Sequence, residues 1–308
     1  MPKLPDLLKQ PAPATPPKLT SRRIGIHTST AGGVEHAAER AYRLGCNTFQ
    51  MFTSSPRMWK PQSVTRQQCE KMQELRQRYG IRPAVVHTNY LVNLCSANPE
   101  FRQKSIITFR SEIERALDLG AEYLVLHPGS FNGLTREEGI TAVVESIKKS
   151  LDGLPAAERD FKILIENTAG SEFSLGGSFE QVGELVTRLR PFAPVGACID
   201  TCHTHVRGYD IVTRKSYDET MRQLDALVGL AHVHVWHCND AKSKQGSKLD
   251  RHEQIGLGTI GLEPFRWLLN DPRTAHAAFI AETPIAEEGD DQKNIDVLKA
   301  LVENSTQQ

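Results

Sequence analysis

The 308-residue sequence predicts an α/β protein of the (β/α)8 TIM-barrel class, and two observations carry that prediction. Eight short aliphatic runs, typical of buried parallel strands, alternate with amphipathic helical segments. Six of these runs end on a residue that can bind metal, and barrel enzymes place their chemistry at the C-terminal ends of the strands. A doubly wound open sheet is the alternative, but it would gather ligands mainly at one crevice.

The expected elements follow one another at regular spacing from Arg23 onward. We expect strands at residues 23–28, 48–53, 83–88, 123–128, 162–167, 195–200, 233–238 and 278–283. Helical patterns fill the gaps at residues 34–44, 65–79, 101–119, 136–151, 179–190, 216–230, 262–269 and 289–303. Glycines follow the first three helical segments, as is common at a helix C-terminus. The pattern predicts a single barrel domain over residues 23–308.

Residues 1–22 are set apart from the barrel by their composition. Prolines crowd this segment and large apolar residues are few. We therefore expect a disordered or polyproline-like tail. The chain has no run of about 18 apolar residues, so no membrane span is expected. Its six cysteines show no paired framework and no signal peptide precedes them, which favours a reducing cytoplasm.

The candidate metal ligands are imidazoles and carboxylates, which suit Zn²⁺, Mn²⁺ or Fe²⁺. Six of them end the aliphatic runs: His87, His127, Glu166, Asp200, His237 and Glu282. Three more are expected in loops: His203, Asp250 and His252. A single histidine at a strand end is more often structural, but nine such residues together predict a polynuclear metal enzyme. Cys198 and Cys202 could also bind zinc, although small buried residues beside a strand end are the favoured interpretation.

The chain resembles the endonuclease IV family of apurinic/apyrimidinic endonucleases, from about Arg23 to about Thr283. The resemblance is carried by several motifs that occur in order: Gly25-Ile26-His27, His127-Pro128-Gly129-Ser130, Ile165-Glu166-Asn167-Thr168-Ala169-Gly170, Cys198-Ile199-Asp200-Thr201-Cys202-His203, Asn239-Asp240-Ala241-Lys242-Ser243, Asp250-Arg251-His252 and Glu282-Thr283. Matches this long, in this order, are highly specific.

The resemblance implies three zinc ions per chain and assigns the nine ligands among them. The first ion would be held by His87, His127 and Glu166. Glu166 would bridge to the second ion, which Asp200, His237 and Glu282 complete. The third ion would be held by His203, Asp250 and His252. The resemblance also implies that Arg57, Tyr90 and Leu91 enter the DNA at the lesion.

The implied activity is that of base excision DNA repair. The enzyme would hydrolyse the phosphodiester 5′ to an abasic site in duplex DNA, leaving a 3′-hydroxyl and a 5′-deoxyribose phosphate. Glu166 would act with the zinc ions to activate the attacking water. Removal of 3′-blocking groups is also implied. The formal net charge is zero, so the bound cations would supply the positive charge that DNA requires. We expect a monomer in a bacterial cytoplasm, associated with the nucleoid through its substrate.

Two other functions remain open on the sequence. A xylose-isomerase-like sugar isomerase or epimerase would need only Glu166, Asp200, His237 and Glu282, and it would leave the other candidate ligands without a purpose. A DNA-damage binding protein without catalysis is the second alternative. A degenerate site of that kind would be expected to lack at least one ligand, and none is missing.

Overall fold

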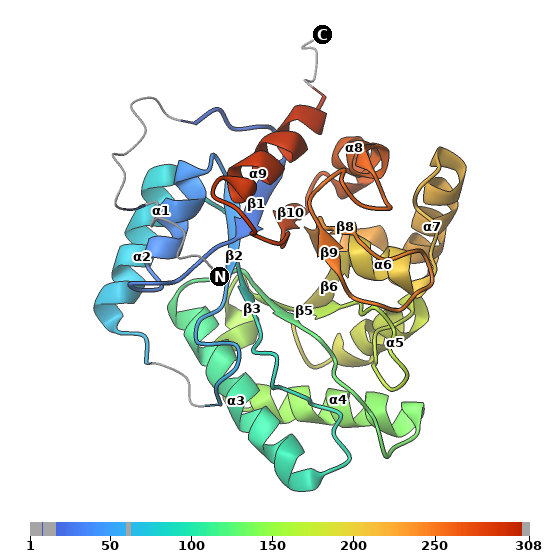
Figure 1. The fold of residues 1–308 in the computed structure, drawn as a ribbon. Helices are drawn as coiled ribbons and strands as arrows, with labels where there is room; N and C mark the ends of the chain where they lie inside the picture. Colours follow the sequence, from blue (N-terminus) through green and yellow to red (C-terminus); the bar gives the residue numbers. More distant parts are fainter. Residues whose placement is uncertain (1–7, 9–16, 60–62, 304–308) are drawn as a thin grey trace.

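A closed barrel of eight parallel strands forms the centre of the protein (Figure 1). The structure is a computed structural model that describes residues 8, 17–59 and 63–303. Within these residues the barrel closes in the order β1-β10-β7-β6-β5-β4-β3-β2, which confirms the predicted fold class. The barrel strands are β1 Arg23–His27, β2 Thr48–Met51, β3 Ala84–His87, β4 Tyr123–Leu126, β5 Lys162–Glu166, β6 Val195–Asp200, β7 Val233–His237 and β10 Ala278–Ala281.

Helices surround the strands, with α1 and α2 on one side of the barrel and α5 and α7 on the other (Figure 1). The α-helices of the described residues are α1 His36–Arg43, α2 Arg66–Tyr79, α3 Pro99–Asp118, α4 Arg136–Leu151, α5 Phe179–Leu189, α6 Thr201–Arg207, α7 Arg214–Leu227, α8 Leu262–Asn270 and α9 Asp290–Leu301. Short 3₁₀ helices lie at Pro155–Glu158, Leu230–His232 and Pro272–Thr274. None of the described helices is long and apolar enough to cross a membrane.

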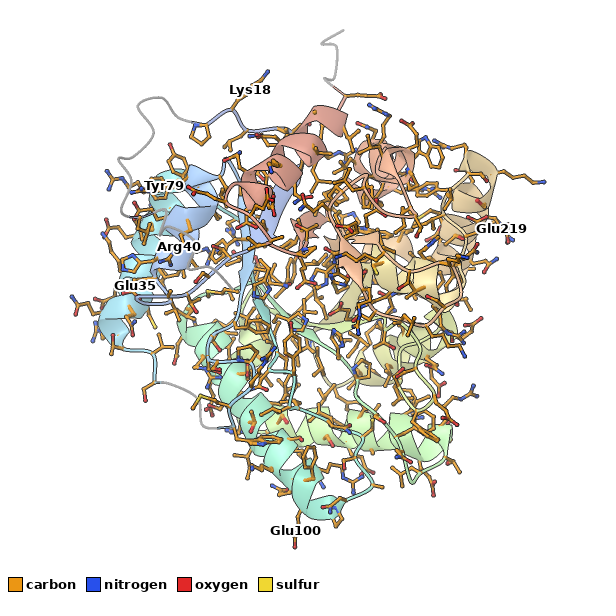
Figure 2. The ribbon with its side chains drawn as sticks, in the orientation of Figure 1. Lys18, Glu35, Arg40, Tyr79, Glu100 and Glu219 are labelled. Carbon is orange, nitrogen blue, oxygen red and sulfur yellow. The ribbon has the colours of Figure 1, made fainter. Side chains whose placement is uncertain are left out.

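Local capping explains where several helices begin. Thr65 and Gln68 form a reciprocal capping box before α2, and Thr135 and Glu138 form another before α4. Each such cap contributes about 1 kcal/mol by satisfying backbone N–H groups at the first turn. Thr213 caps α7, so this helix begins two residues earlier than the expected segment 216–230, and it ends at Leu227. Charged side chains such as Glu219 of α7 project away from the barrel (Figure 2).

The structure corrects the expected positions of two ligand candidates. His203 was expected in a loop but lies in α6, a helix that the sequence did not predict. The helix forms because the Asp200 side chain accepts a hydrogen bond from the His203 backbone N–H at 2.9 Å, which is the geometry of an N-cap. His252 was also expected in a loop, but it lies in β9 (His252–Glu253), which pairs antiparallel with β8 (Asp240–Ala241). Asp250 lies in the connection between these two strands, as expected.

The apolar core has two parts, and the barrel walls separate them. Inside the barrel, small and branched side chains fill the space below the mouth: Val85, Val125, Leu164, Cys198, Val235, Ala278 and Ile280. A larger cluster packs between the outer face of the strands and the helices, and includes Phe49, Phe109 and Phe265. Alternate residues along each strand face the same cluster. His87 and Glu166 lie two residues after Val85 and Leu164 of the inner cluster, so their side chains are directed into the mouth of the barrel.

Part of the predicted N-terminal tail lies within the described residues. Asn47 donates hydrogen bonds through its side-chain amide to the carbonyls of Thr20 and Arg22, and Arg22 donates to the carbonyl of Asp271 at 3.2 Å. Residues 17–22 therefore contact the barrel before β1 begins. Residues 1–7 and 9–16 of the predicted tail lie outside the described residues.

Candidate metal centre

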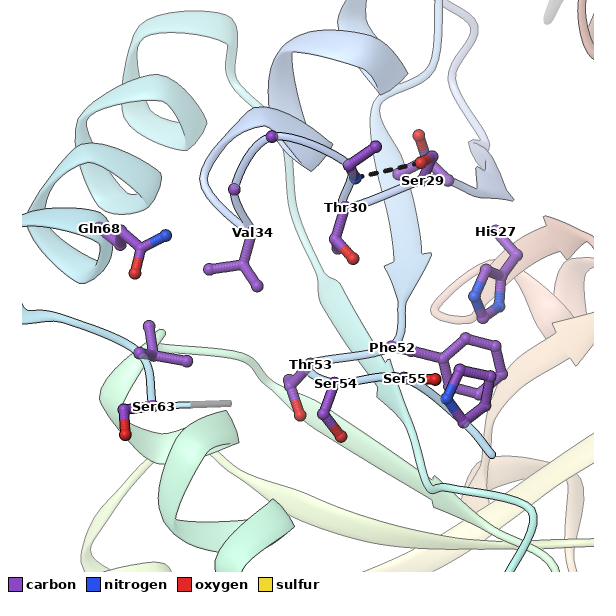
Figure 3. A pocket seen from close by; sticks show the side chains of 16 residues that line it. His27, Ser29, Thr30, Val34, Phe52, Thr53, Ser54, Ser55, Ser63 and Gln68 are labelled. Atoms are coloured by element: carbon purple, nitrogen blue, oxygen red, sulfur yellow. Dashed lines mark hydrogen bonds between the residues drawn. The ribbon is translucent and has the colours of Figure 1, made fainter. Parts of the chain in front are cut away.

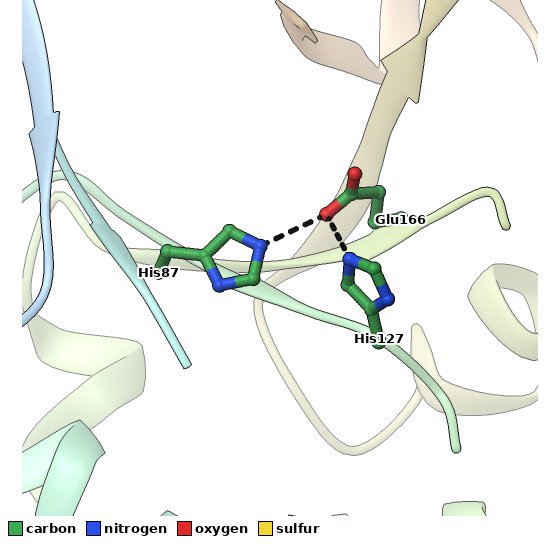
Figure 4. A group of neighbouring side chains, drawn as sticks. All are labelled: His87, His127 and Glu166. Carbon is green, nitrogen blue, oxygen red and sulfur yellow. Dashed lines mark hydrogen bonds and ion pairs between the residues drawn. The ribbon is translucent and has the colours of Figure 1, made fainter. Parts of the chain in front are cut away.

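The Glu166 carboxylate lies at the centre of the barrel mouth, at the end of β5. One of its oxygens, Oε2, is 3.2 Å from His87 Nε2 and 3.0 Å from His127 Nε2. Figure 4 shows the two imidazoles converging on this single oxygen. His87 is the last residue of β3, and His127 lies one residue beyond β4. Three neighbouring strands therefore bring two nitrogens and one oxygen close enough together to hold one cation.

The other oxygen of Glu166 faces a second group of ligand-type side chains. His237 Nδ1 lies 3.0 Å from Glu166 Oε1 and 3.1 Å from Glu282 Oε2. Asp200 Oδ2 lies 3.9 Å from the same nitrogen. The potential ligand atoms of these four residues all lie within 4.8 Å of one another. Glu166 is thus shared between two adjoining groups, as a bridging ligand would be.

A third group lies next to the second, on α6 and around β9. Asp250 approaches His203 Nε2 at 3.2 Å and His252 Nε2 at 3.1 Å. Asp200 also belongs here, because its Oδ2 lies 3.7 Å from His252 Nε2 and it groups with His203 and His252. The structure therefore brings together all nine residues singled out from the sequence, and it places Asp200 between the second and third groups.

Hydrogen bonds set the tautomers of three of these histidines. The Nδ1 atoms of His87, His203 and His252 lie 2.8, 2.9 and 3.1 Å from backbone carbonyl oxygens. A carbonyl oxygen can only accept, so each Nδ1 donates its proton to it. The lone pair of each neutral ring is then on Nε2, the nitrogen that faces the carboxylates. A metal-binding histidine is commonly oriented by such a bond on its other nitrogen.

Gln50, near the end of β2, orients the fourth histidine and was not identified from the sequence. Its side-chain Nε2 donates to Glu282 Oε1 at 2.5 Å, and a carboxylate can only accept. Its Oε1 must therefore face His237 Nε2, at 2.8 Å, and this nitrogen donates. His237 Nδ1 is left to face the carboxylates of the second group. A buried amide in the aliphatic run Thr48-Phe49-Gln50-Met51 was the signal in the sequence that could have indicated this role.

His27 and Asn239 are further residues that hold the ligands in place. His27 Nδ1 lies 3.3 Å from Glu282 Oε1, so this residue contacts the site. Asn239, whose role was not predicted from the sequence, donates to Asp200 Oδ2 at 2.7 Å and accepts from the Glu282 backbone N–H at 2.8 Å. One buried amide thus fixes the Asp200 carboxylate relative to the backbone of Glu282.

The buried carboxylates and imidazoles of the site shift one another's pKa values toward the charged forms. Burial by itself would raise the pKa of the Glu166 carboxyl, but the imidazoles of His127 and His237 hold it well below its usual range. Burial would lower the pKa of His203, yet nearby Asp200 and Asp250 raise it to about 10. The same balance of burial against Asp200 raises the pKa of His252 to about 9. Protons on these imidazoles therefore balance the carboxylates when no cation is bound.

The chemistry of these donors fits divalent metal ions. His252 Nε2 is buried and has no hydrogen-bond partner, although it faces two carboxylates. Once the ring loses its proton, the lone pair on this nitrogen, which faces Asp200 and Asp250, is a suitable ligand for a cation. Three groups of nitrogen and oxygen donors match the preferences of Zn²⁺ and of similar ions. The Cys198 sulfur also lies within 4.8 Å of ligand atoms of Glu166 and His237, but burial raises the pKa of its thiol to about 12, which disfavours the thiolate that zinc binding requires.

The three residues expected to contact DNA lie on two loops at the rim. Arg57 is exposed in the loop after β2, and Tyr90 is 62% exposed in the loop after β3, followed by the half-buried Leu91. The two loops are tied together by Asn89, whose side chain donates to the carbonyls of Ser55 and Met58. The structure therefore places exposed Arg57 and Tyr90 on one joined rim, and the Tyr90 ring lies 5.9 Å from that of His87.

A pocket of about 760 Å³ opens beside this rim, between the loops that follow β1 and β2. Figure 3 shows His27 and Phe52 at one end of the pocket, and Ser29, Thr53 and Ser55 among its polar lining. His27 also contacts Glu282 of the second ligand group. The pocket therefore adjoins the candidate metal centre at this residue.

The fold and the ligand groups together define a class, the metal-dependent enzymes built on a xylose isomerase-like barrel. The family model described as "Xylose isomerase-like TIM barrel" matches residues 38–301. A protein named "Probable endonuclease 4" from Solibacter usitatus is 46% identical over 282 residues, which covers 91% of this chain and 96% of the relative. The crystal structure of endonuclease IV from Thermus thermophilus has 37% identity and a TM-score of 0.81, over 91% of this chain and 98% of that chain.

The chain belongs to the endonuclease IV family, whose members are DNA-hydrolysing enzymes. A D-tagatose 3-epimerase-like protein of known structure also matches, with 20% identity and a TM-score of 0.66 over 91% of this chain and 96% of that chain. That likeness shows the shared barrel fold alone.

Proposed function

We propose that this protein is a zinc-dependent apurinic/apyrimidinic endonuclease of base excision repair. It hydrolyses the phosphodiester 5′ to an abasic site in duplex DNA and leaves a 3′-hydroxyl and a 5′-deoxyribose phosphate. By the same hydrolysis it removes blocking groups from 3′ ends. The observation that carries this proposal is the convergence of nine nitrogen and oxygen ligands into three adjoining groups. Membership of the endonuclease IV family supports the DNA substrate.

The ligand groups fit three zinc ions, one for each group, and neighbouring groups share a carboxylate. His87 and His127 would hold one ion with Glu166. Glu166 would also hold a second ion, together with Asp200, His237 and Glu282. The third would lie between α6 and β9, on His203, Asp250 and His252. Zinc in such a site supplies Lewis acidity, which lowers the pKa of water and neutralises charge on a phosphate.

The protein's own groups position the reactants and hold the ligands rigidly. The hydrogen bonds from Nδ1 of His87, His203 and His252 fix the rings before substrate arrives, so that little reorganisation is required during the reaction. Glu166 is fully buried and lies between two ligand groups, so its charge acts on both of them. Asn239 keeps the carboxylate of Asp200 aligned with the backbone of Glu282. A phosphodiester would therefore meet a preorganised, partly water-excluded centre.

Recognition of the abasic site would depend on the rim. A recessed cluster requires the abasic nucleotide to leave the helix, and the missing base lowers the unstacking cost. Arg57, Tyr90 and Leu91 lie on the joined loops above the ligand groups, where they would fill or wedge the gap in the duplex. Tyr90 is suited to this role because the residue is largely exposed while one part of its ring packs against the rings of Phe52 and His87.

The test is cleavage of a labelled duplex that carries one tetrahydrofuran abasic analogue, with and without a zinc chelator. This analogue cannot undergo β-elimination, so any nick must be hydrolytic. The expected result is a single nick on the 5′ side with a 3′-hydroxyl, which is lost as the chelator removes the metal. Absence of a nick from protein that holds three metal ions would refute the proposal. Sugar isomerase activity in the same preparation would then identify the alternative function.

A further inference from the structure

A second pocket lies on the opposite side of the candidate metal centre from the joined rim, and the metal centre does not use it. Its volume is about 600 Å³. It is lined by the loop after β5, the end of α6 and the segment between β8 and β9, with Ser171, Gln181, Arg207, Ser247 and Lys248 among its polar residues. Arg207 lies one helical turn beyond His203 on α6. Lys248 lies two residues before Asp250. The pocket therefore adjoins the third ligand group.

Arg207 is held in this pocket without a partner for its charge. Its side chain lies across two glycines of the loop after β5. A Cβ atom at Gly170 would lie only 2.7 Å from Arg207 Nε, and one at Gly177 would lie 3.4 Å from it. Nε is buried and has no hydrogen-bond partner. The backbone thus makes room for this guanidinium, and nothing in the described part of the chain neutralises it.

Lys248 is brought beside Arg207 by the backbone. Its N–H donates to the carbonyl of Val206 at 2.9 Å, which fixes the segment to the end of α6. Lys248 has a φ of 57° and is the one non-glycine residue with a positive φ in the described ranges. This conformation costs a lysine roughly 1 kcal/mol or more, and such strain is found most often at functional positions. The lysine is exposed and forms no ion pair with any described residue.

The lining of the pocket is suited to a phosphate group. The lining contains two cationic side chains and one acidic side chain, Glu172, so the pocket carries net positive charge. A guanidinium and an ammonium beside serine hydroxyls are the groups that most often bind phosphate oxygens of a nucleic-acid backbone. Because Lys248 lies two residues before Asp250 in the chain, a strand that reaches the metal centre would pass near the pocket.

We propose that the Arg207–Lys248 pocket binds a backbone phosphodiester of the DNA, at a position other than the bond that is cut. The inference rests on the proposed function, because it takes DNA as the substrate. The interaction would position the strand and carry no sequence information. Its contribution should fall as salt concentration rises, because binding a phosphate releases condensed counterions.

The test compares Arg207→Gln and Lys248→Gln with the wild-type zinc-loaded enzyme on the tetrahydrofuran duplex at several salt concentrations. Each variant is expected to raise KM roughly tenfold at low salt, as for loss of a charged hydrogen bond, and to change kcat little. The slope of log(kcat/KM) against log salt should become shallower by about 0.9 for each phosphate that the variant no longer binds. Lys149→Gln is the matched control, because it removes one exposed charge from the last turn of α4, away from the barrel mouth.

The arms of the experiment separate the possible failures. If the wild-type enzyme cleaves but the KM and salt slope of both variants match those of Lys149→Gln, the phosphodiester pocket is refuted and the proposed function stands. If the wild-type enzyme does not cleave, both proposals fall. A further outcome would also overturn the proposal and would assign the pocket to free phosphate. In that outcome millimolar inorganic phosphate protects the wild-type enzyme against thermal unfolding, and neither variant changes the salt slope of log(kcat/KM). Lys248→Gln keeps the test decisive if Arg207→Gln does not fold, because Lys248 is exposed.

Discussion

Replacement of Gln50 by leucine tests whether the hydrogen bonds behind the ligands set the metal affinity. Gln50 is fully buried, and its amide joins His237 Nε2 to Glu282 Oε1. Leucine has a similar volume but can neither accept nor donate. The substitution would therefore leave the His237 Nε2–H without an acceptor inside the barrel and release Glu282 from one of its donors.

The expected size of the effect follows from these hydrogen bonds. A buried polar group left without a partner costs about 1–3 kcal/mol, which corresponds to a loss of roughly 5- to 150-fold in an equilibrium constant. This range agrees with the roughly 10- to 100-fold loss seen when residues that orient metal ligands are changed. We therefore expect Gln50→Leu to weaken zinc binding in the second ligand group by about that factor, and to recover much of its activity in excess zinc.

The assay is a zinc titration against a competing chelator, with cleavage of the tetrahydrofuran duplex measured in parallel. Met51→Leu is the matched control, because Met51 is the next residue of β2, is equally buried, and faces the helix layer. A volume-conserving change there should alter stability by less than about 1.5 kcal/mol and leave zinc affinity unchanged. A Gln50→Leu enzyme that binds zinc as tightly as the control would refute the reasoning.

Three further predictions concern the ligand groups directly. Glu166→Gln is expected to reduce turnover by about 10³-fold or more, because it removes the charge shared by two groups; wild-type turnover would disprove a shared role. His203→Ala should retain two zinc ions per chain by elemental analysis and lose most of its rate, whereas three tightly held ions would exclude His203 as a ligand. In zinc-stripped protein the raised pKa of His252, about 9, stabilises the fold fully below pH 6.5, and this stability is lost as the pH rises towards 9. Over the same interval zinc affinity should rise, since binding must displace the proton; a zinc titration that does not depend on pH between 6.5 and 9 would contradict this.

Much of the architecture was predictable from local patterns. The aliphatic runs that end at His87, Glu166 and Asp200 were recognisable as strands because both faces of each strand are buried, which leaves few polar residues in the run. The observed strands end within two residues of the predicted bounds. Once the strands are assigned to a parallel barrel, the ligands are expected on one rim, because all C-terminal strand ends lie at the same face.

The sequence could not reveal interactions that depend on distant segments meeting. α6 was missed because its seven residues are too few to show helical periodicity, and because its N-cap, Asp200, was already interpreted as a ligand at the end of a strand. Gln50 was missed because its importance arises only when the closed barrel brings side chains from β2, β7 and the end of β10 together at its mouth. A polar residue within a predicted strand was the one local sign of Gln50, and it does not show which side chains its amide contacts.

By itself the sequence determined the barrel, the nine ligand-type residues and the rim at which they gather, because strand burial and strand direction are encoded in short-range patterns. The tertiary structure alone decided how those residues are grouped. It placed Asp200 between two groups, gave four of the five ligand histidines their tautomers through specific acceptors, and brought Arg207 beside Lys248. Apart from the bond between His87 and the adjacent Thr88, these features depend on contacts between residues that are not neighbours in the chain, and the folded barrel brings such residues together.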